Sequence, residues 1–274
     1  MILTHLCPHC RFLLSSDRFM TSKILRIPYA VYALVTFLLT MLLVAPFVVI
    51  ASFFGKIKGG NAIYRLCMFW GDLWFLLIGI FHVNRYEVPH DKSKQYIFVS
   101  NHISYLDAPV IVKTIRQKVR ILGKSEMSRI PVFGFIYKNA IVTVDRSSAQ
   151  QRAKSVRILK SVLQKGISIF IFPEGTFNET HRPLKDFFDG AFKIAIETQT
   201  PIKPVLFLDA YTRLNYKSLL SISPGKNRSV FLDEIPVEGY TMNDLIILKK
   251  KVYEIMEKTL VEYNAAWIDH SISG

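Results

Sequence analysis

A histidine and an aspartate stand five residues apart directly after an apolar run, in residues 96–110 (YIFVSNHISYLDAPV). An imidazole with its ordinary pKa of ~6.5 can accept a proton at neutral pH. A carboxylate on its other ring nitrogen would fix the tautomer and stabilise the imidazolium that forms. His102 and Asp107 are therefore a candidate general-base pair that could activate a substrate hydroxyl directly. Residues five apart lie ~140° apart on a regular helix, so we expect a turn between them.

Further ionisable side chains follow the other apolar runs of the chain. Lys124 ends the run RILGK, Arg146 ends AIVTVDR, and Glu174 and Gly175 follow IFIFP. Taken alone, each of these residues could be a turn residue, a helix cap or a surface charge. Ligands of α/β proteins, however, collect outside the carboxyl ends of strands. Four strand ends that each carry such a group favour one shared site.

The apolar pattern predicts the elements that position these groups. Short apolar runs predict strands at residues 96–100, 119–124, 140–146, 167–174, 202–208 and 229–235. Amphipathic stretches predict helices at 148–164 and 186–199, and a capping box at 241–244 precedes a third helix at 245–260. Strands that alternate with helices indicate an α/β fold with a mixed, largely parallel sheet flanked by helices.

Two apolar segments precede this alternation. Residues 27–55 carry no charged side chain over 29 positions, and a membrane span needs about 20 apolar residues. Pro46 and the basic residues at both ends also fit a bent hairpin that dips into one leaflet. The transmembrane span and the hairpin therefore both stay open as alternatives. In residues 62–83, Trp70 and Trp74 share one helical face, which suits the headgroup zone of a bilayer, with a buried core helix as the alternative. We expect a two-helix membrane-associated module.

Composition indicates a membrane surface as the partner. The chain has 35 Lys+Arg against 21 Asp+Glu, a net charge of +14, and is 50% hydrophobic. A basic and apolar chain fits an anionic leaflet, whereas nucleic acid would account for the charge alone. Three cysteines are too few for a disulfide framework. We divide the chain into an N-terminal extension (1–22), for which disorder is one interpretation, the apolar helical module (23–83) and an α/β catalytic domain (84–274).

Four blocks of sequence resemble the 1-acyl-sn-glycerol-3-phosphate acyltransferase family, the glycerolipid acyltransferases with a His-x4-Asp motif. The first block is NHISYLD, which carries His102 and Asp107. The second, GKSEMSRIPVFGFIYKNAIVTVDR, has matching residues at Lys124, Gly134, Asp145 and Arg146. The third is FPEGT (172–176), and the fourth, TPIKPVLF, contains Pro204. The motifs cover roughly residues 96–207, and their combination is far more specific than His-x4-Asp alone.

The resemblance implies an O-acyltransferase of phospholipid biosynthesis. His102, oriented by Asp107, would deprotonate the free hydroxyl of lysophosphatidic acid, and the alkoxide would attack an acyl thioester of coenzyme A or acyl carrier protein. Arg146 and Lys124 would hold the acceptor's phosphate, and Glu174, Gly175 and Thr176 would help to shape the acceptor pocket. The resemblance implies no metal and no cofactor besides the thioester co-substrate, and membrane lipids rather than nucleic acid as partners. The catalytic domain would lie at the membrane, on its cytoplasmic side.

Two positions depart from the family's pattern. Phe177 stands where an arginine often follows Glu-Gly-Thr, and Phe188-Asp189 replaces basic residues before Gly-Ala-Phe. Another lysolipid, such as an N-acylated amino acid lipid with a free hydroxyl, is therefore an alternative acceptor. Two other classes also stay open: a metal-dependent hydrolase, which would need more ligands than Glu174 at nearby strand ends, and a non-catalytic lipid-binding protein.

Overall fold

The computed structural model describes residues 23–144 and 148–269. The expected N-terminal extension (1–22) and Arg146 lie outside the described residues. Within the described residues, one hydrophobic core cluster joins the helices α2 (Lys23–Ser52) and α3 (Gly60–Leu77) to the sheet and its flanking helices.

In the part of the chain that the structure describes, seven strands form one sheet in the order β1-β7-β6-β2-β5-β3-β4. All neighbouring strands are parallel except β6 and β7. The mixed, largely parallel sheet predicted from the sequence is therefore confirmed. The strands are β1 (Ile80–Tyr86), β2 (Ile97–Val99), β3 (Val119–Lys124), β4 (Ile141–Val144), β5 (Ser168–Ile171), β6 (Ile202–Phe207) and β7 (Gly225–Phe231).

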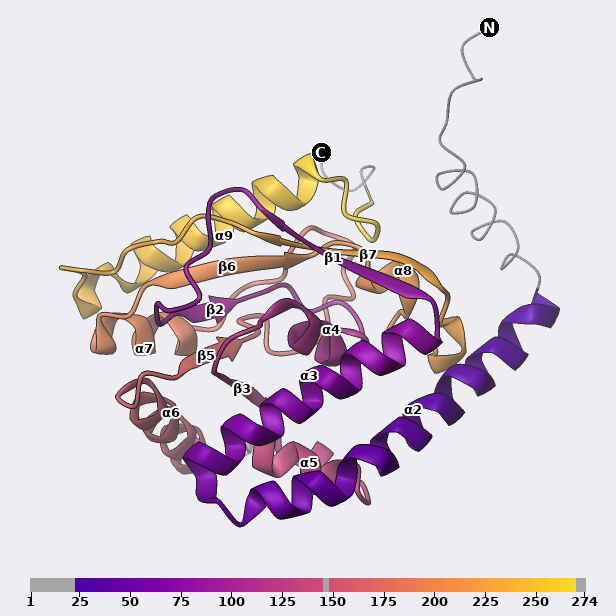
Figure 1. The fold of residues 1–274 in the computed structure, drawn as a ribbon. Coiled ribbons are helices and arrows are strands. Elements are labelled where there is room, and N and C mark those ends of the chain that lie inside the picture. Colours follow the sequence, from indigo (N-terminus) through magenta and orange to yellow (C-terminus); the bar gives the residue numbers. More distant parts are fainter. Residues whose placement is uncertain (1–22, 145–147, 270–274) are drawn as a thin grey trace, which may run out of the picture.

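Helices cover both faces of the sheet (Figure 1). On one face, α3 packs against α4, α5 and β1; on the other, α7 packs against β2, α6 and α9. The helices are α2 (Lys23–Ser52), α3 (Gly60–Leu77), α4 (Asp107–Thr114), α5 (Phe133–Ala140), α6 (Ala149–Leu163), α7 (Gly190–Thr198), α8 (Ala210–Arg213) and α9 (Leu245–Glu262). Short helical turns are η1 (Gly55–Gly59), η2 (Ser125–Arg129), η3 (Leu219–Ser221) and η4 (Met242–Asp244).

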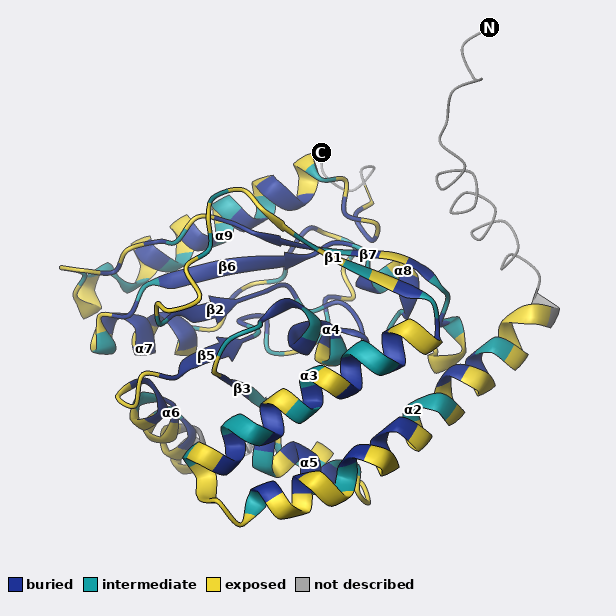
Figure 2. Cartoon of the chain, viewed as in Figure 1, coloured by how far each residue is buried: buried dark blue, intermediate teal, exposed yellow. Residues whose placement is uncertain are grey.

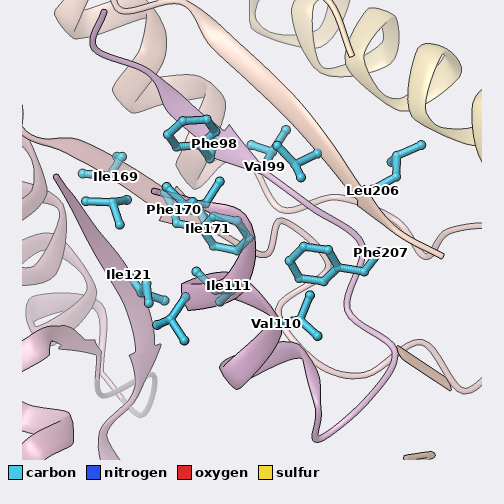
Figure 3. Close-up of a cluster of buried hydrophobic side chains, with 14 of the residues drawn as sticks. Phe98, Val99, Val110, Ile111, Ile121, Ile169, Phe170, Ile171, Leu206 and Phe207 are labelled. Atoms are coloured by element: carbon cyan, nitrogen blue, oxygen red, sulfur yellow. The ribbon is translucent and has the colours of Figure 1, made fainter. Parts of the chain in front are cut away.

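The chain changes direction across the sheet between β2 and β5. After β2 it crosses through α4 to β3, whereas after β5 it crosses the opposite way through α7 to β6. Right-handed crossovers in opposite directions place the two helices on opposite faces. A crevice opens at the carboxyl ends of strands at such a switch point, which is where open α/β sheets bind ligands. Buried side chains such as Phe98, Phe170 and Phe207 pack across these central strands (Figure 3).

One strand was not predicted from the sequence. We expected the second apolar segment to remain helical to residue 83, but α3 ends at Leu77 and Gly79 adopts a left-handed conformation with φ of 63°. The following residues form β1, which pairs in parallel with β7. The boundary that we expected between residues 83 and 84 therefore falls inside a strand of the sheet.

The two apolar segments form a pair of packed helices, as expected, but the tryptophans face inward. Trp70 Nε1 donates a hydrogen bond to Thr40 Oγ1 (2.9 Å), and Trp74 Nε1 donates to the carbonyl of Ala33 (2.9 Å). Both rings also contact Phe37. Their expected position in the headgroup zone is wrong, because these rings join α3 to α2 and are buried there.

Helix α2 exposes a long apolar surface. Residues Leu25–Ser52 are long and apolar enough to cross a membrane, and 28% of their apolar window is buried. Figure 2 shows exposed positions repeating along the whole helix, and they include Leu34, Leu38, Leu42 and Phe47. Burial of so much apolar area away from water is favourable, so α2 indicates an association with membrane.

Candidate active site

His102 and Asp107 meet at the carboxyl end of β2. His102 Nδ1 lies 2.8 Å from Asp107 Oδ2, and the aspartate side chain is fully buried. The same Oδ2 accepts hydrogen bonds from the backbone N–H groups of Ile103 (2.7 Å) and Ser104 (2.9 Å). The turn that the five-residue spacing required is thus built around the carboxylate itself. Because Asp107 begins α4, its charge also lies at the favourable end of the helix dipole.

Glu174 fixes the loop of residues 101–107, here called the catalytic loop. Its Oε1 accepts a hydrogen bond from His102 N (2.8 Å), and its Oε2 accepts one from Lys185 N (2.9 Å). Burial raises the pKa of Glu174 to about 8, although these two donors oppose the shift. The carboxyl group therefore joins the catalytic loop to the segment after β5. The role of Glu174 in an acceptor pocket stays a prediction.

Further contacts leave the catalytic loop little freedom. The Asn101 side chain bonds to both the N–H (2.9 Å) and the carbonyl (3.0 Å) of Phe207 on β6. The His102 carbonyl accepts a hydrogen bond from Asn178 N (2.7 Å). Ser104 is buried and its hydroxyl donates to the carbonyl of Leu214. Ser104 is thus committed to the backbone and is not poised as a nucleophile.

Aromatic rings enclose the imidazole of His102. Phe172 stacks on it with ring centroids 4.0 Å apart, and Phe177 meets it edge-on at 4.4 Å. Tyr105 packs against Phe177 in turn, at 5.0 Å. The side chain of His102 remains 22% exposed. Since Asp107 holds Nδ1, a proton from a substrate would be taken up at Nε2.

Of the two predicted cations, Lys124 lies within the described residues. Lys124 is the last residue of β3, which β5 separates from β2 in the sheet, and its Nζ lies 3.3 Å from Glu126 Oε1. Arg146 lies outside the described residues. The Glu-Gly-Thr turn itself is as expected: Gly175 has φ of 72°, a conformation that favours glycine.

Lys185 brings a cation to this turn that the sequence did not reveal. Its Nζ donates a hydrogen bond to Thr176 Oγ1 (2.7 Å) and lies 3.4 Å from the carbonyl of Phe177. Lys185 occurs in a stretch without regular secondary structure between β5 and α7. No periodicity or motif singles it out there, so only the folded chain places it beside Thr176.

The described residues do not assemble a metal-ligand cluster. Across 23–144 and 148–269, no three His, Cys, Asp or Glu side chains come together in an arrangement that could hold a metal ion. Glu174, the extra ligand that a metal-dependent hydrolase would use, is bonded instead to two backbone N–H groups. The contacts of Glu174 and of the His102–Asp107 pair fit a general base assisted by a carboxylate.

Comparisons with known proteins find similarity to acyltransferases. A family model described as Acyltransferase matches residues 80–208. The chain is 28% identical to a 1-acyl-sn-glycerol-3-phosphate acyltransferase of Haemophilus influenzae, over 65% of this chain and 74% of the relative. The human protein 1-acyl-sn-glycerol-3-phosphate acyltransferase beta is 26% identical over 69% of each chain.

A fission-yeast relative and a solved structure extend the comparison. An uncharacterized acyltransferase of Schizosaccharomyces pombe is 31% identical over 62% of each chain, so the match spans less than two thirds of that protein. The crystal structure of the 1-acyl-sn-glycerophosphate (LPA) acyltransferase PlsC from Thermotoga maritima superimposes with a TM-score of 0.71. That match covers 90% of this chain and 99% of the other at 22% identity, and it shows a shared fold.

Proposed function

Because the chain belongs to the 1-acyl-sn-glycerol-3-phosphate acyltransferase family, we propose that it acylates the free hydroxyl of lysophosphatidic acid. The product is phosphatidic acid, and the donor is a fatty acyl thioester of coenzyme A or acyl carrier protein. The observation that carries this proposal is the hydrogen bond between His102 Nδ1 and Asp107 Oδ2, in a loop fixed at the switch point of the sheet.

The reaction follows from the position of the imidazole. His102 Nε2 takes the proton of the acceptor hydroxyl as its oxygen attacks the thioester carbonyl. Asp107 stabilises the imidazolium that results. The tetrahedral intermediate then loses its C–S bond, and the thiolate leaves with the proton that the imidazolium returns. Because Ser104 is occupied by the backbone, the acyl group passes directly from donor to acceptor without an acyl-enzyme.

Cations near the site bind the acceptor's phosphate in this proposal. Lys185 and the hydroxyl of Thr176 lie at the Glu-Gly-Thr turn, and Lys124 and Arg146 retain the phosphate-binding role implied by the family's second block. Charge-assisted hydrogen bonds of this kind are about twice as strong as neutral ones. The reaction requires no metal and no cofactor besides the thioester.

A second acceptor class remains a candidate because of one observation. Phe177 packs on the His102 ring at a position where the family often places an arginine. An apolar wall there also suits a lysolipid with a less charged headgroup, such as an N-acylated amino acid lipid with a free hydroxyl.

We further propose that α2 anchors the catalytic domain to the cytoplasmic side of the membrane. Its exposed apolar side chains supply the contact area, and the net charge of +14 favours the anionic cytoplasmic leaflet. Membrane lipids are then both the support and the source of the acceptor.

Purified protein incubated with a panel of lysolipids and both thioester donors tests the function. We expect the mass of phosphatidic acid among the products when lysophosphatidic acid is the acceptor, with and without a chelator. Products from other lysolipids alone would select the second acceptor class. Loss of all activity in the chelator would contradict the transferase and support the hydrolase.

A further inference from the structure

The segment between β6 and β7 links the catalytic loop to helix α2. Leu214 in this segment accepts the hydrogen bond from Ser104 Oγ. A few residues further along, η3 packs directly against α2. The segment therefore touches both the active site and the apolar helix.

The apolar side chains of the η3 turn are exposed and are not covered by other described parts of the chain. Leu219 is 62% exposed and Leu220 is 49% exposed, beside a helix whose own exposed side chains are almost all apolar. Lys217 lies exposed just before them, and Lys23 and Arg26 precede the apolar part of α2. Apolar side chains flanked by basic ones suit the boundary of an anionic leaflet.

A row of aromatic rings continues from η3 to the catalytic histidine. Tyr216, three residues before Leu219, faces Phe177 with ring centroids 6.3 Å apart and planes 25° apart. Phe177 in turn contacts the ring of His102 at 4.4 Å. The row thus leads from Tyr216, three residues before the exposed Leu219, to the reacting imidazole.

We propose that Leu219 and Leu220 insert into the leaflet beside α2, and that a lipid acceptor reaches His102 along Tyr216 and Phe177. The occupant of this surface is a phospholipid leaflet. We call Leu219, Leu220 and the exposed side of α2 the docking surface. The inference rests on the proposed function, because it concerns how that acceptor enters the site.

The chain offers a matched control for this surface. Ile246 and Ile247 on α9 are 72% and 60% exposed, and α9 lies across the sheet from α2 (Figure 1). The test compares Leu219→Ser/Leu220→Ser with Ile246→Ser/Ile247→Ser, after circular dichroism has confirmed that both are folded. Each is assayed with lysophosphatidic acid in vesicles of phosphatidylcholine and phosphatidylglycerol, and with a short-chain, water-soluble lysophosphatidic acid.

The ratio of the two KM values, vesicle acceptor over soluble acceptor, is the measurement. Removing two leucines from a leaflet contact should raise this ratio by about 10-fold or more, given the free energy of burying a leucine. The control should leave the ratio unchanged, and sedimentation with vesicles should weaken in the leucine variant alone.

Three results would overturn the inference. An unchanged ratio, or an equal change in the control, would remove the leucines from the docking surface. A change of oligomeric state in the leucine variant would make η3 a contact between protein copies instead. Wild-type protein that acylates neither acceptor would contradict the proposed function, whereas vesicle sedimentation reports on docking without any turnover.

Discussion

The catalytic loop and the docking surface depend on their side chains in different ways. The loop depends on where each group lies, and the docking surface depends on how much apolar area is exposed. In and around the catalytic loop, the buried carboxylates of Asp107 and Glu174 are bound to their partners at 2.7–2.9 Å. On α2 and η3, leucine and valine side chains are exposed, and each contributes to membrane contact through its apolar area. Chemistry depends on position to a fraction of an ångström, whereas membrane contact depends on summed area. Single substitutions should therefore be severe in the first region and mild in the second.

The largest expected effect is that of Asp107→Asn. An amide cannot stabilise the imidazolium, and it would hold His102 in the wrong tautomer, which costs ~10⁴-fold in turnover in a comparable catalytic arrangement. We expect kcat to fall by about that factor while vesicle sedimentation remains at the wild-type level. Steady-state kinetics with both acceptors measure the loss. A fall of less than about 10-fold would mean that the carboxylate is structural only.

Glu174→Gln should have the next largest effect. Glutamine keeps one acceptor oxygen but turns an NH2 group toward the other backbone N–H, so the link between His102 and Lys185 breaks. A small displacement of the catalytic group can cost ~10²-fold, and we expect this in kcat. A rise in the acceptor KM with kcat unchanged would instead assign Glu174 to the acceptor pocket.

Lys185→Met should weaken binding more modestly. Loss of a charge-assisted hydrogen bond to phosphate should raise the acceptor KM by ~10-fold or more and leave the donor KM unchanged. Lys193→Met is the matched control, because Lys193 pairs with Asp189 on the surface of α7. Equal changes in both KM values would exclude a phosphate-binding role for Lys185.

The smallest effect is a dependence of stability on pH. The pKa of Glu174 is about 8 in the folded protein and ~4.3 when exposed to water. Between these values the folded state binds more protons than the unfolded state, so the free energy of unfolding should fall as pH rises, by at most about 1.4 kcal/mol per pH unit. Thermal melting of wild type and Glu174→Gln across this window gives the slope, which should be shallower in the variant. Equal slopes would contradict the assigned shift.

The sequence predicted those helices and strands that are determined by short-range patterns of apolar and capping residues. Each of the six expected strands overlaps a strand of the sheet, although β7 begins and ends four residues before the expected range of 229–235. The capping box at Thr241 and Asp244 precedes α9. Gly79 lies where α3 gives way to β1, but the apolar run around it concealed the change from helix to strand. Trp70 and Trp74 were correctly placed on one helical face, while the side that this face contacts depended on α2.

The active site likewise contains residues that the sequence predicted and contacts that it did not. His102, Asp107 and the Glu-Gly-Thr turn were predictable, because their chemistry is tied to fixed spacings. The contacts of Glu174 with two distant backbone N–H groups were not, since they arise only when β2 and β5 lie side by side. Lys185 and the packing of Phe177 on His102 likewise depend on how an irregular segment returns to the sheet.

The most direct test of a histidine general base is the product formed by His102→Gln. Wild type and variant, both confirmed as folded and bound to vesicles, are incubated with lysophosphatidic acid and acyl-coenzyme A, and phosphatidic acid is followed by mass. We expect a loss of about 10⁴-fold in the variant, because general-base catalysis by a positioned imidazole contributes up to this factor. A variant that retains turnover within about 10-fold of wild type would contradict it.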